Sequence, residues 1–100
     1  MTKRITRAHL EAKARTINIM RHAPLEPYRT VNGKAVANVG NHHISGAYGG
    51  YSLHRMSNEC GGASDVLTNG HTSARELAAL MSAYTAGLYD ASRPWTDGKK

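Results

Sequence analysis

The segment NHHISGAYGGYSLHRMSNECGGASDVL, residues 41–67, decides the fold class of this chain. Glycine pairs at 49–50 and 61–62 permit tight turns or bulges, and they divide the segment into short runs. The run between the two pairs alternates as a strand does, with Leu53 on one face and His54 on the other. The segment therefore predicts an antiparallel meander of three strands, near 42–48, 51–57 and 64–68.

A further hairpin is predicted upstream of the meander. The sequence YRTVNGKAVANV, residues 28–39, places Asn32 and Gly33 between two short β-prone runs. Asn-Gly is a strong hairpin signal, because a type I′ turn needs positive φ at both central positions. Pro24 and Pro27 remove backbone donors just before this hairpin, so we expect any preceding helix to end there.

The first predicted helix spans residues 3–22 and is amphipathic. Its periodicity predicts a core-facing apolar side centred on Ile5, Ala8, Ala12 and Ile19 and widened by Leu10, Ile17 and Met20. The opposite side, which also carries Asn18, is expected to form a basic outer stripe, although an ordinary solvated face fits the pattern equally well. The basic side chains of this stripe are Lys3, Arg4, Arg7, Arg15 and Arg21.

The second predicted helix begins at a capping box, in which Ser73 and Glu76 exchange hydrogen bonds with terminal amides. Its expected apolar face consists of Leu77, Leu80, Met81, Tyr84 and Leu88. Together these elements predict an α+β domain over residues 1–92, followed by a polar tail over 93–100. The domain comprises an N-terminal helix, an antiparallel sheet of three to five strands and a C-terminal helix packed on the sheet.

The second helix carries no charge between residues 77 and 88. Small side chains on its second face would let another helix come close. We expect a second chain to cover this face, either as a homodimer or as a docked partner. Coverage by the first helix, or an open alanine-rich surface, are the alternatives. The small-residue seam consists of Ala79, Ser82, Ala83, Ala86 and Gly87.

Composition points to a cytoplasmic binding protein. The chain has 13 Lys and Arg against 7 Asp and Glu, and the excess is concentrated in its first third, which suits an acidic partner. A single cysteine, Cys60, allows no internal disulfide. No apolar run approaches the roughly 20 residues of a membrane span, and the N-terminus does not read as a signal peptide.

Histidine and cysteine side chains are the candidates for chemistry. Their spacing matches no zinc motif, and the neighbours His42 and His43 would point to opposite faces of a strand. No partner for a Cys60 nucleophile is identifiable either. We therefore predict no catalytic residues, no metal and no cofactor. The side chains considered were His42, His43, His54, Cys60 and His71.

The predicted order of helix, three strands and helix, with the basic excess, resembles that of double-stranded-RNA-binding domains. In that family the second helix opens with lysines that contact phosphates. The matching segment here, GHTSARELAA over residues 70–79, offers only His71 and Arg75, and the charge lies on the first helix instead. This resemblance implies direct nucleic-acid binding as the alternative function.

A second resemblance covers residues 38–89. The Gly-Gly-bounded strand, the glycine-rich turn with Ser-Asp-Val and the helix that opens with Arg-Glu-Leu are similar to a pattern in small uncharacterised phage and prophage proteins. By analogy this implies a non-catalytic protein that binds and blocks a host target, as anti-CRISPR proteins do. The implied partner is a host protein or nucleoprotein complex, plausibly one that handles nucleic acid in defence.

Overall fold

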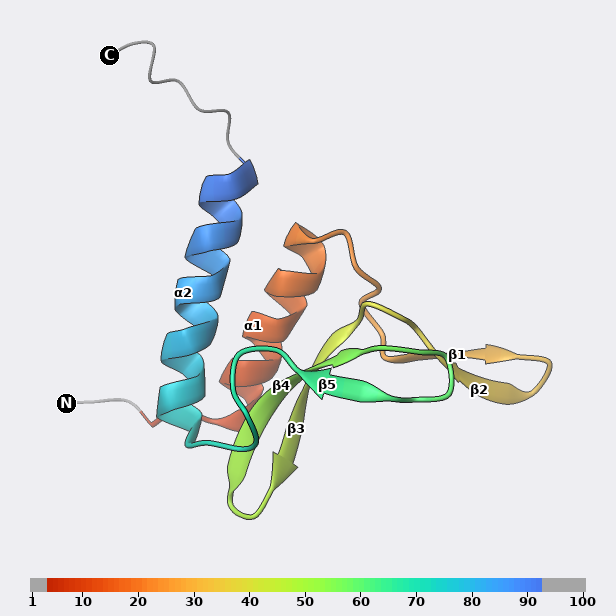
Figure 1. Ribbon diagram of the computed structural model, residues 1–100, viewed down its shortest axis with the longest axis horizontal. Coiled ribbons are helices and arrows are strands. Elements are labelled where there is room, and N and C mark those ends of the chain that lie inside the picture. The colour runs from red at the N-terminus through yellow and green to blue at the C-terminus, as the bar shows by residue number, and fades with distance from the viewer. Residues whose placement is uncertain (1–3, 93–100) are drawn as a thin grey trace, which may run out of the picture.

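The protein has an α+β fold in the computed structural model, which describes residues 4–92 (Figure 1). All five strands pair antiparallel, and α2 packs against α1 and β4. The predicted fold class is confirmed, with the difference that the strands form two small sheets rather than one. The elements are α1 (Arg7–Met20), β1 (Tyr28–Val31), β2 (Lys34–Ala37), β3 (His42–Ala47), β4 (Gly50–Met56), β5 (Ala63–Asp65) and α2 (Ala74–Ser92).

The body of the molecule is the three-stranded sheet β3-β4-β5 with both helices against one of its faces. Figure 1 shows that α1 and α2 lie side by side and begin at the same end of the body. The core fills the space between helices and sheet, and its fully buried apolar side chains are Leu10, Ile17, Leu53, Leu77 and Met81. The predicted meander is confirmed, although β5 is only three residues long.

The predicted apolar face of α1 is only partly correct, because its margin, Leu10 and Ile17, is buried whereas its centre is largely exposed. Leu10, Ile17 and Asn18 are buried, whereas Ile19 is 56% exposed and Ala12 is exposed. Burying a large aliphatic side chain stabilises the fold by about 1.5–3 kcal/mol, far more than burying an alanine methyl. The helix therefore turns Leu10 and Ile17 inward, and Asn18, on the same side, goes with them.

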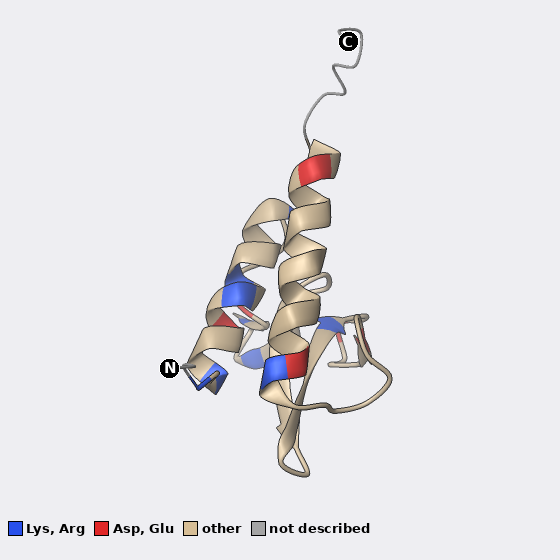
Figure 2. Ribbon diagram, turned by 90° about the vertical axis from the view of Figure 1, so that its left-hand side faces the viewer, with Lys and Arg blue, Asp and Glu red and all other residues tan. Residues whose placement is uncertain are grey.

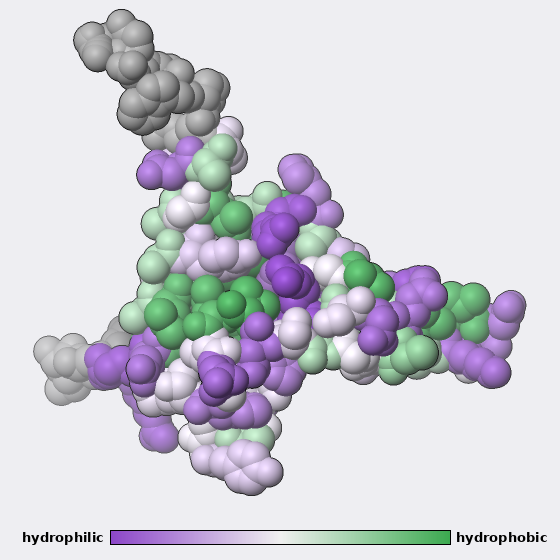
Figure 3. Space-filling view, viewed as in Figure 1, coloured by the Kyte–Doolittle hydropathy of each residue, from purple (hydrophilic) through white to green (hydrophobic). Residues whose placement is uncertain are grey.

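The β1-β2 hairpin forms an arm that projects from the body (Figure 1). Asn32 has φ +51° and Gly33 has φ +78°, which confirms the predicted turn with two left-handed residues. Every residue of β1 is exposed, and Figure 3 shows hydrophobic colour along the arm between hydrophilic patches. At the base of the arm, Glu59 accepts from the Ala37 N–H at 3.2 Å through its carbonyl and from Arg29 Nη2 at 3.0 Å through its carboxylate.

The start of α2 contains half of the predicted capping box. The Glu76 N–H donates to Ser73 Oγ at 3.1 Å, as expected. The Glu76 carboxylate instead accepts from Thr72 Oγ1 at 2.7 Å, so the reciprocal bond is replaced by a side-chain bond. Leu77 and Met81 are buried as predicted, but Leu80 lies at the edge of the buried face and is 37% exposed. Neither helix in residues 4–92 is both long and apolar enough to cross a membrane.

Candidate functional site

Two of the predicted basic side chains are taken up by contacts within the protein. Arg7 Nη2 donates to the Ile44 carbonyl at 3.0 Å, and Arg7 Nε pairs with Glu11 at 3.0 Å. Arg21 Nη1 donates to the Tyr84 hydroxyl at 3.1 Å. These arginines therefore join α1 to β3 and to α2, and they do not form one continuous outer stripe with the rest.

Arg4 and Arg15 remain exposed and make no hydrogen bond or ion pair with other residues in the described range 4–92. Lys3, the remaining member of the predicted stripe, lies outside the described residues. Arg75, in the first turn of α2, is also exposed and makes no hydrogen bond or ion pair with other residues in the range 4–92. From the sequence alone, Arg75 is only a weak match to the phosphate-binding lysines of double-stranded-RNA-binding domains, and it is not among the predicted contact residues.

Both helix N-termini lie at one end of the body, and Figure 2 shows Lys and Arg colour at the first turn of each. The first turn of α1 contains no acidic residue, and that of α2 contains only Glu76. A helix N-terminus carries positive partial charge from its unpaired N–H groups, so it adds to the field of the arginines. This end of the molecule, which we call the basic end, is defined by Arg4, Arg75 and the two helix starts, whereas Arg15 lies about two turns farther along α1.

The small-residue seam is open in the single chain. All five of its residues, Ala79, Ser82, Ala83, Ala86 and Gly87, are exposed. The alternative in which α1 covers the seam is wrong, because the buried residues of α2 are Leu77, Ala78 and Met81. Ser82 still bonds to α1, because its hydroxyl accepts from Lys13 Nζ at 2.8 Å.

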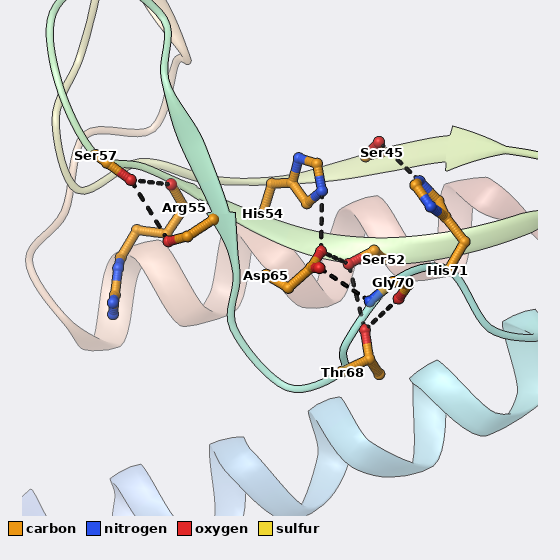
Figure 4. Close-up of polar contacts among 10 residues, drawn as sticks. Ser45, Ser52, His54, Arg55, Ser57, Asp65, Thr68, Gly70 and His71 are labelled. Atoms are coloured by element: carbon orange, nitrogen blue, oxygen red, sulfur yellow. Dashed lines mark hydrogen bonds and ion pairs between the residues drawn. The ribbon is translucent and has the colours of Figure 1, made fainter.

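A polar network occupies the face of the sheet away from the helices (Figure 4). Asp65 Oδ1 accepts from Ser52 Oγ at 2.5 Å, and Asp65 Oδ2 accepts from the Gly70 N–H at 2.9 Å. The bond from Ser52, followed by those from Gly70 and His54, lowers the pKa of Asp65 despite the opposing effect of burial. The network binds the loop after β5 onto the sheet, which explains why Ser52 is fully buried.

Three histidines form a row on the same face. The ring centroids of His43 and His54 are 5.8 Å apart, and those of His54 and His71 are 6.0 Å apart. His54 Nε2 lies 3.1 Å from Asp65 Oδ1, and His71 Nε2 lies 3.1 Å from Ser45 Oγ. Burial, and then the charge of His54, lower the pKa of His43.

This row holds no set of three convergent metal ligands among residues 4–92. As predicted, His42 and His43 point to opposite faces, since His42 contacts Asn18 of α1 and His43 contacts His54. Cys60 is exposed, and its backbone N–H donates to Asn58 at 2.9 Å. The polar network around Asp65 therefore holds the loop after β5 against the sheet, and its contacts orient the His54 ring.

Asn18 makes the contact that sequence reasoning missed. Its Oδ1 accepts from the His42 N–H at 2.7 Å, and its Nδ2 donates to the His42 carbonyl at 3.0 Å. The side-chain amide thus pairs with the outer edge of β3 as a neighbouring strand would. The available signal was the position of Asn18 on the same helical face as Leu10, Ala14 and Ile17.

Comparison with known proteins found no matching family model, no matching curated protein and no matching solved structure.

Proposed function

We propose that this protein is a non-catalytic binding protein that engages an acidic surface of its partner. The basic end carries the proposal, because Arg4 and Arg75 there, and Arg15 farther along α1, are exposed and unpaired within the described residues. Both helix N-termini lie at this end. An acidic partner would replace water around these groups with complementary charge. Such complementarity raises the association rate and makes binding weaken with salt.

The kind of partner follows from the resemblance to small phage proteins. We propose a host protein or nucleoprotein complex in the cytoplasm, plausibly a nucleic-acid-handling defence complex that the bound protein blocks in the manner of an anti-CRISPR protein. In this proposal Arg7 and Arg21 hold the fold together, since both have partners within the chain. The contact set is therefore Arg4, Arg15 and Arg75.

Affinity purification from cells of the phage host tests this proposal. We expect the parent protein to retain a specific partner whose recovery falls with rising salt. A variant with Arg4→Gln, Arg15→Gln and Arg75→Gln should lose that partner. The matched control is Lys34→Gln, which removes an exposed charge from the tip of the arm and should leave recovery unchanged. Equal recovery with the triple variant would refute a role for the basic end.

Direct binding to nucleic acid is the second candidate. It is favoured by the helix–three strands–helix order of the body, with both helices on one face of the sheet. Gel shifts with duplex and single-stranded nucleic acid at two salt concentrations separate the candidates. Tight, salt-sensitive binding by the purified protein alone supports this candidate, and its absence supports a protein target.

We also propose that the small-residue seam mediates self-association. Alanine and glycine on an exposed helix face permit close approach of a second helix, and Gly87 has no neighbouring atom within 4 Å of where a Cβ would lie. Sedimentation of Ala83→Glu should show loss of the dimer. Ala12→Glu, an equally exposed alanine on α1, is the control. A parent protein that sediments as a monomer at high concentration would exclude this role.

A further inference from the structure

A hollow of about 240 Å³ lies where the end of α1 meets the sheet, at the opposite end of the helices from the basic end. None of the residues that line it is acidic, in contrast to the larger hollow beside it, where Glu11 and Glu26 accompany Arg7 and Arg15. The smaller hollow is lined by Arg21, Pro24, Val39, Gly40, His42 and Arg55, among others.

His42 contributes an unpaired nitrogen to this region. The residue is only 3% exposed, and its Nε2 is a buried polar side-chain atom without a hydrogen-bond partner in the described part of the chain. His42 Nδ1 lies 3.0 Å from Asn18 Oδ1, whose orientation is set by the two backbone bonds of Asn18. Because Oδ1 is an acceptor, Nδ1 carries the proton of the neutral ring. Nε2 therefore presents a lone pair and requires a donor.

Two guanidinium groups accompany this nitrogen. The half-buried Arg55 side chain makes no hydrogen bond or ion pair within residues 4–92, and Arg21 uses only Nη1, toward Tyr84. Burial, then the charges of Arg21, Arg55 and His43, lower the pKa of His42 to about 4, against a smaller opposing effect of the Gly40 backbone. The ring is therefore neutral at pH 7, while both arginines remain charged.

We propose that this hollow binds inorganic phosphate as the hydrogen phosphate ion. The P–OH group donates to His42 Nε2, and the other oxygens accept from the Arg21 and Arg55 guanidiniums. Sulfate has the same shape but no proton to donate at neutral pH, so one of its oxygens would face the Nε2 lone pair. Nε2 exposes less than 1 Å², so neighbouring side chains must move to admit the ion. Arg21 is exposed and can do so.

The test is an NMR titration of the full chain at pH 7.5 and constant ionic strength with three anions. Inorganic phosphate should produce saturable shifts of the His42 ring and of the Arg21 and Arg55 side-chain signals. Sulfate should bind at least about tenfold more weakly, since it leaves the buried acceptor unpaired. Methyl phosphate should be equally weak, because its second pKa of about 6 leaves it without a P–OH at this pH.

Arg55→Gln should weaken phosphate binding by about tenfold or more, whereas Arg75→Gln, at the basic end, should leave it unchanged. Circular dichroism checks that both variants are folded. If Arg55→Gln does not fold, the affinities of the parent protein for the three anions decide whether the hollow binds hydrogen phosphate. Linear, non-saturating shifts with phosphate would overturn the proposal. So would equal affinity for the three anions or an equal loss in both variants. The proposal is independent of any partner of the basic end.

Discussion

The two β-sheets of this protein differ in how their outer edges are covered. In the body, the outer edge of β3 is closed by side chains of α1, with Asn18 on His42 and Arg7 on the Ile44 carbonyl. In the arm, β1 is exposed along its whole length, and the strands depend on the Asn32-Gly33 turn and a few contacts at the base. The comparison teaches that local turn chemistry suffices to shape a hairpin, whereas a buried sheet edge needs partners from distant sequence.

The largest expected effect is on the body core. Leu53→Ala should lower the free energy of unfolding by about 2–5 kcal/mol, because Leu53 is fully buried between the sheet and the helices. The matched control is Val31→Ala, because Val31 lies on the arm and is 42% exposed. This variant should change the free energy of unfolding by less than about 0.5 kcal/mol. Denaturant unfolding measures both, and equal losses would show that the arm belongs to the same cooperative unit as the core.

The next largest loss of stability is expected when the Asn18 side chain, which pairs with the outer edge of β3, is removed. Asn18→Ala leaves the His42 N–H and carbonyl without partners, and we expect a loss of about 2–4 kcal/mol, since each unpaired buried group costs about 1–3 kcal/mol. Amide hydrogen exchange should accelerate first in β3. Asn69→Ala, at an exposed asparagine in the loop after β5, is the control. An unchanged free energy of unfolding in Asn18→Ala would mean that water replaces the two hydrogen bonds of Asn18 without loss of stability.

Acid should weaken the body. The pKa of His42 is lowered from 6.5 to about 4 in the folded protein, so the unfolded chain binds more protons between these values. Stability is therefore complete above pH 6.5 and falls as pH drops toward 4, with a slope of up to about 1.4 kcal/mol per pH unit. The pKa of Asp65 is also lowered, so its protonation extends the loss of stability to pH values below its ordinary pKa of 3.8. Unfolding curves across this range, with an NMR titration of His42, measure the effect.

The arm strands contain no Asp, Glu or His, so their local pairing should not follow the His42 titration. Protection of arm amides relative to body amides, measured by hydrogen exchange on native protein, separates the two sheets. A body that keeps its stability at pH 5 while the ring of His42 becomes charged would contradict the assigned cause.

The smallest effect on global stability is expected in the arm turn. Gly33→Ala places a side chain at φ +78°, which costs about 1–2 kcal/mol of local strain, although nothing lies within 4 Å of the new methyl. Because the arm contacts little of the body, we expect faster exchange of arm amides and a global change below about 0.5 kcal/mol. Loss of exchange protection in β4 would show that strain in the arm reaches the core.

Much of the fold was predictable because its signals are local. The glycine pairs mark the ends of the body strands, Asn32-Gly33 marks the arm, and Ser73 marks the start of α2. The candidate site was less predictable. The basic residues of α1 could be identified, but nothing local distinguishes Arg7, which contacts a carbonyl 37 residues away, from the unpaired Arg15.

The sequence alone determined which segments form helices, strands and turns, although not their exact ends, because capping, glycine φ values and strand alternation depend on neighbouring residues. Only the tertiary structure decided which side of α1 is buried. Two arcs of that helix carry apolar residues, and the choice rests on how much area each can bury against β3 and α2. That choice places Asn18 against the edge of β3 and leaves His42 Nε2 without a partner. It also separates Arg7 and Arg21, which bond to residues of β3 and α2, from the exposed arginines that have no partner within the described residues.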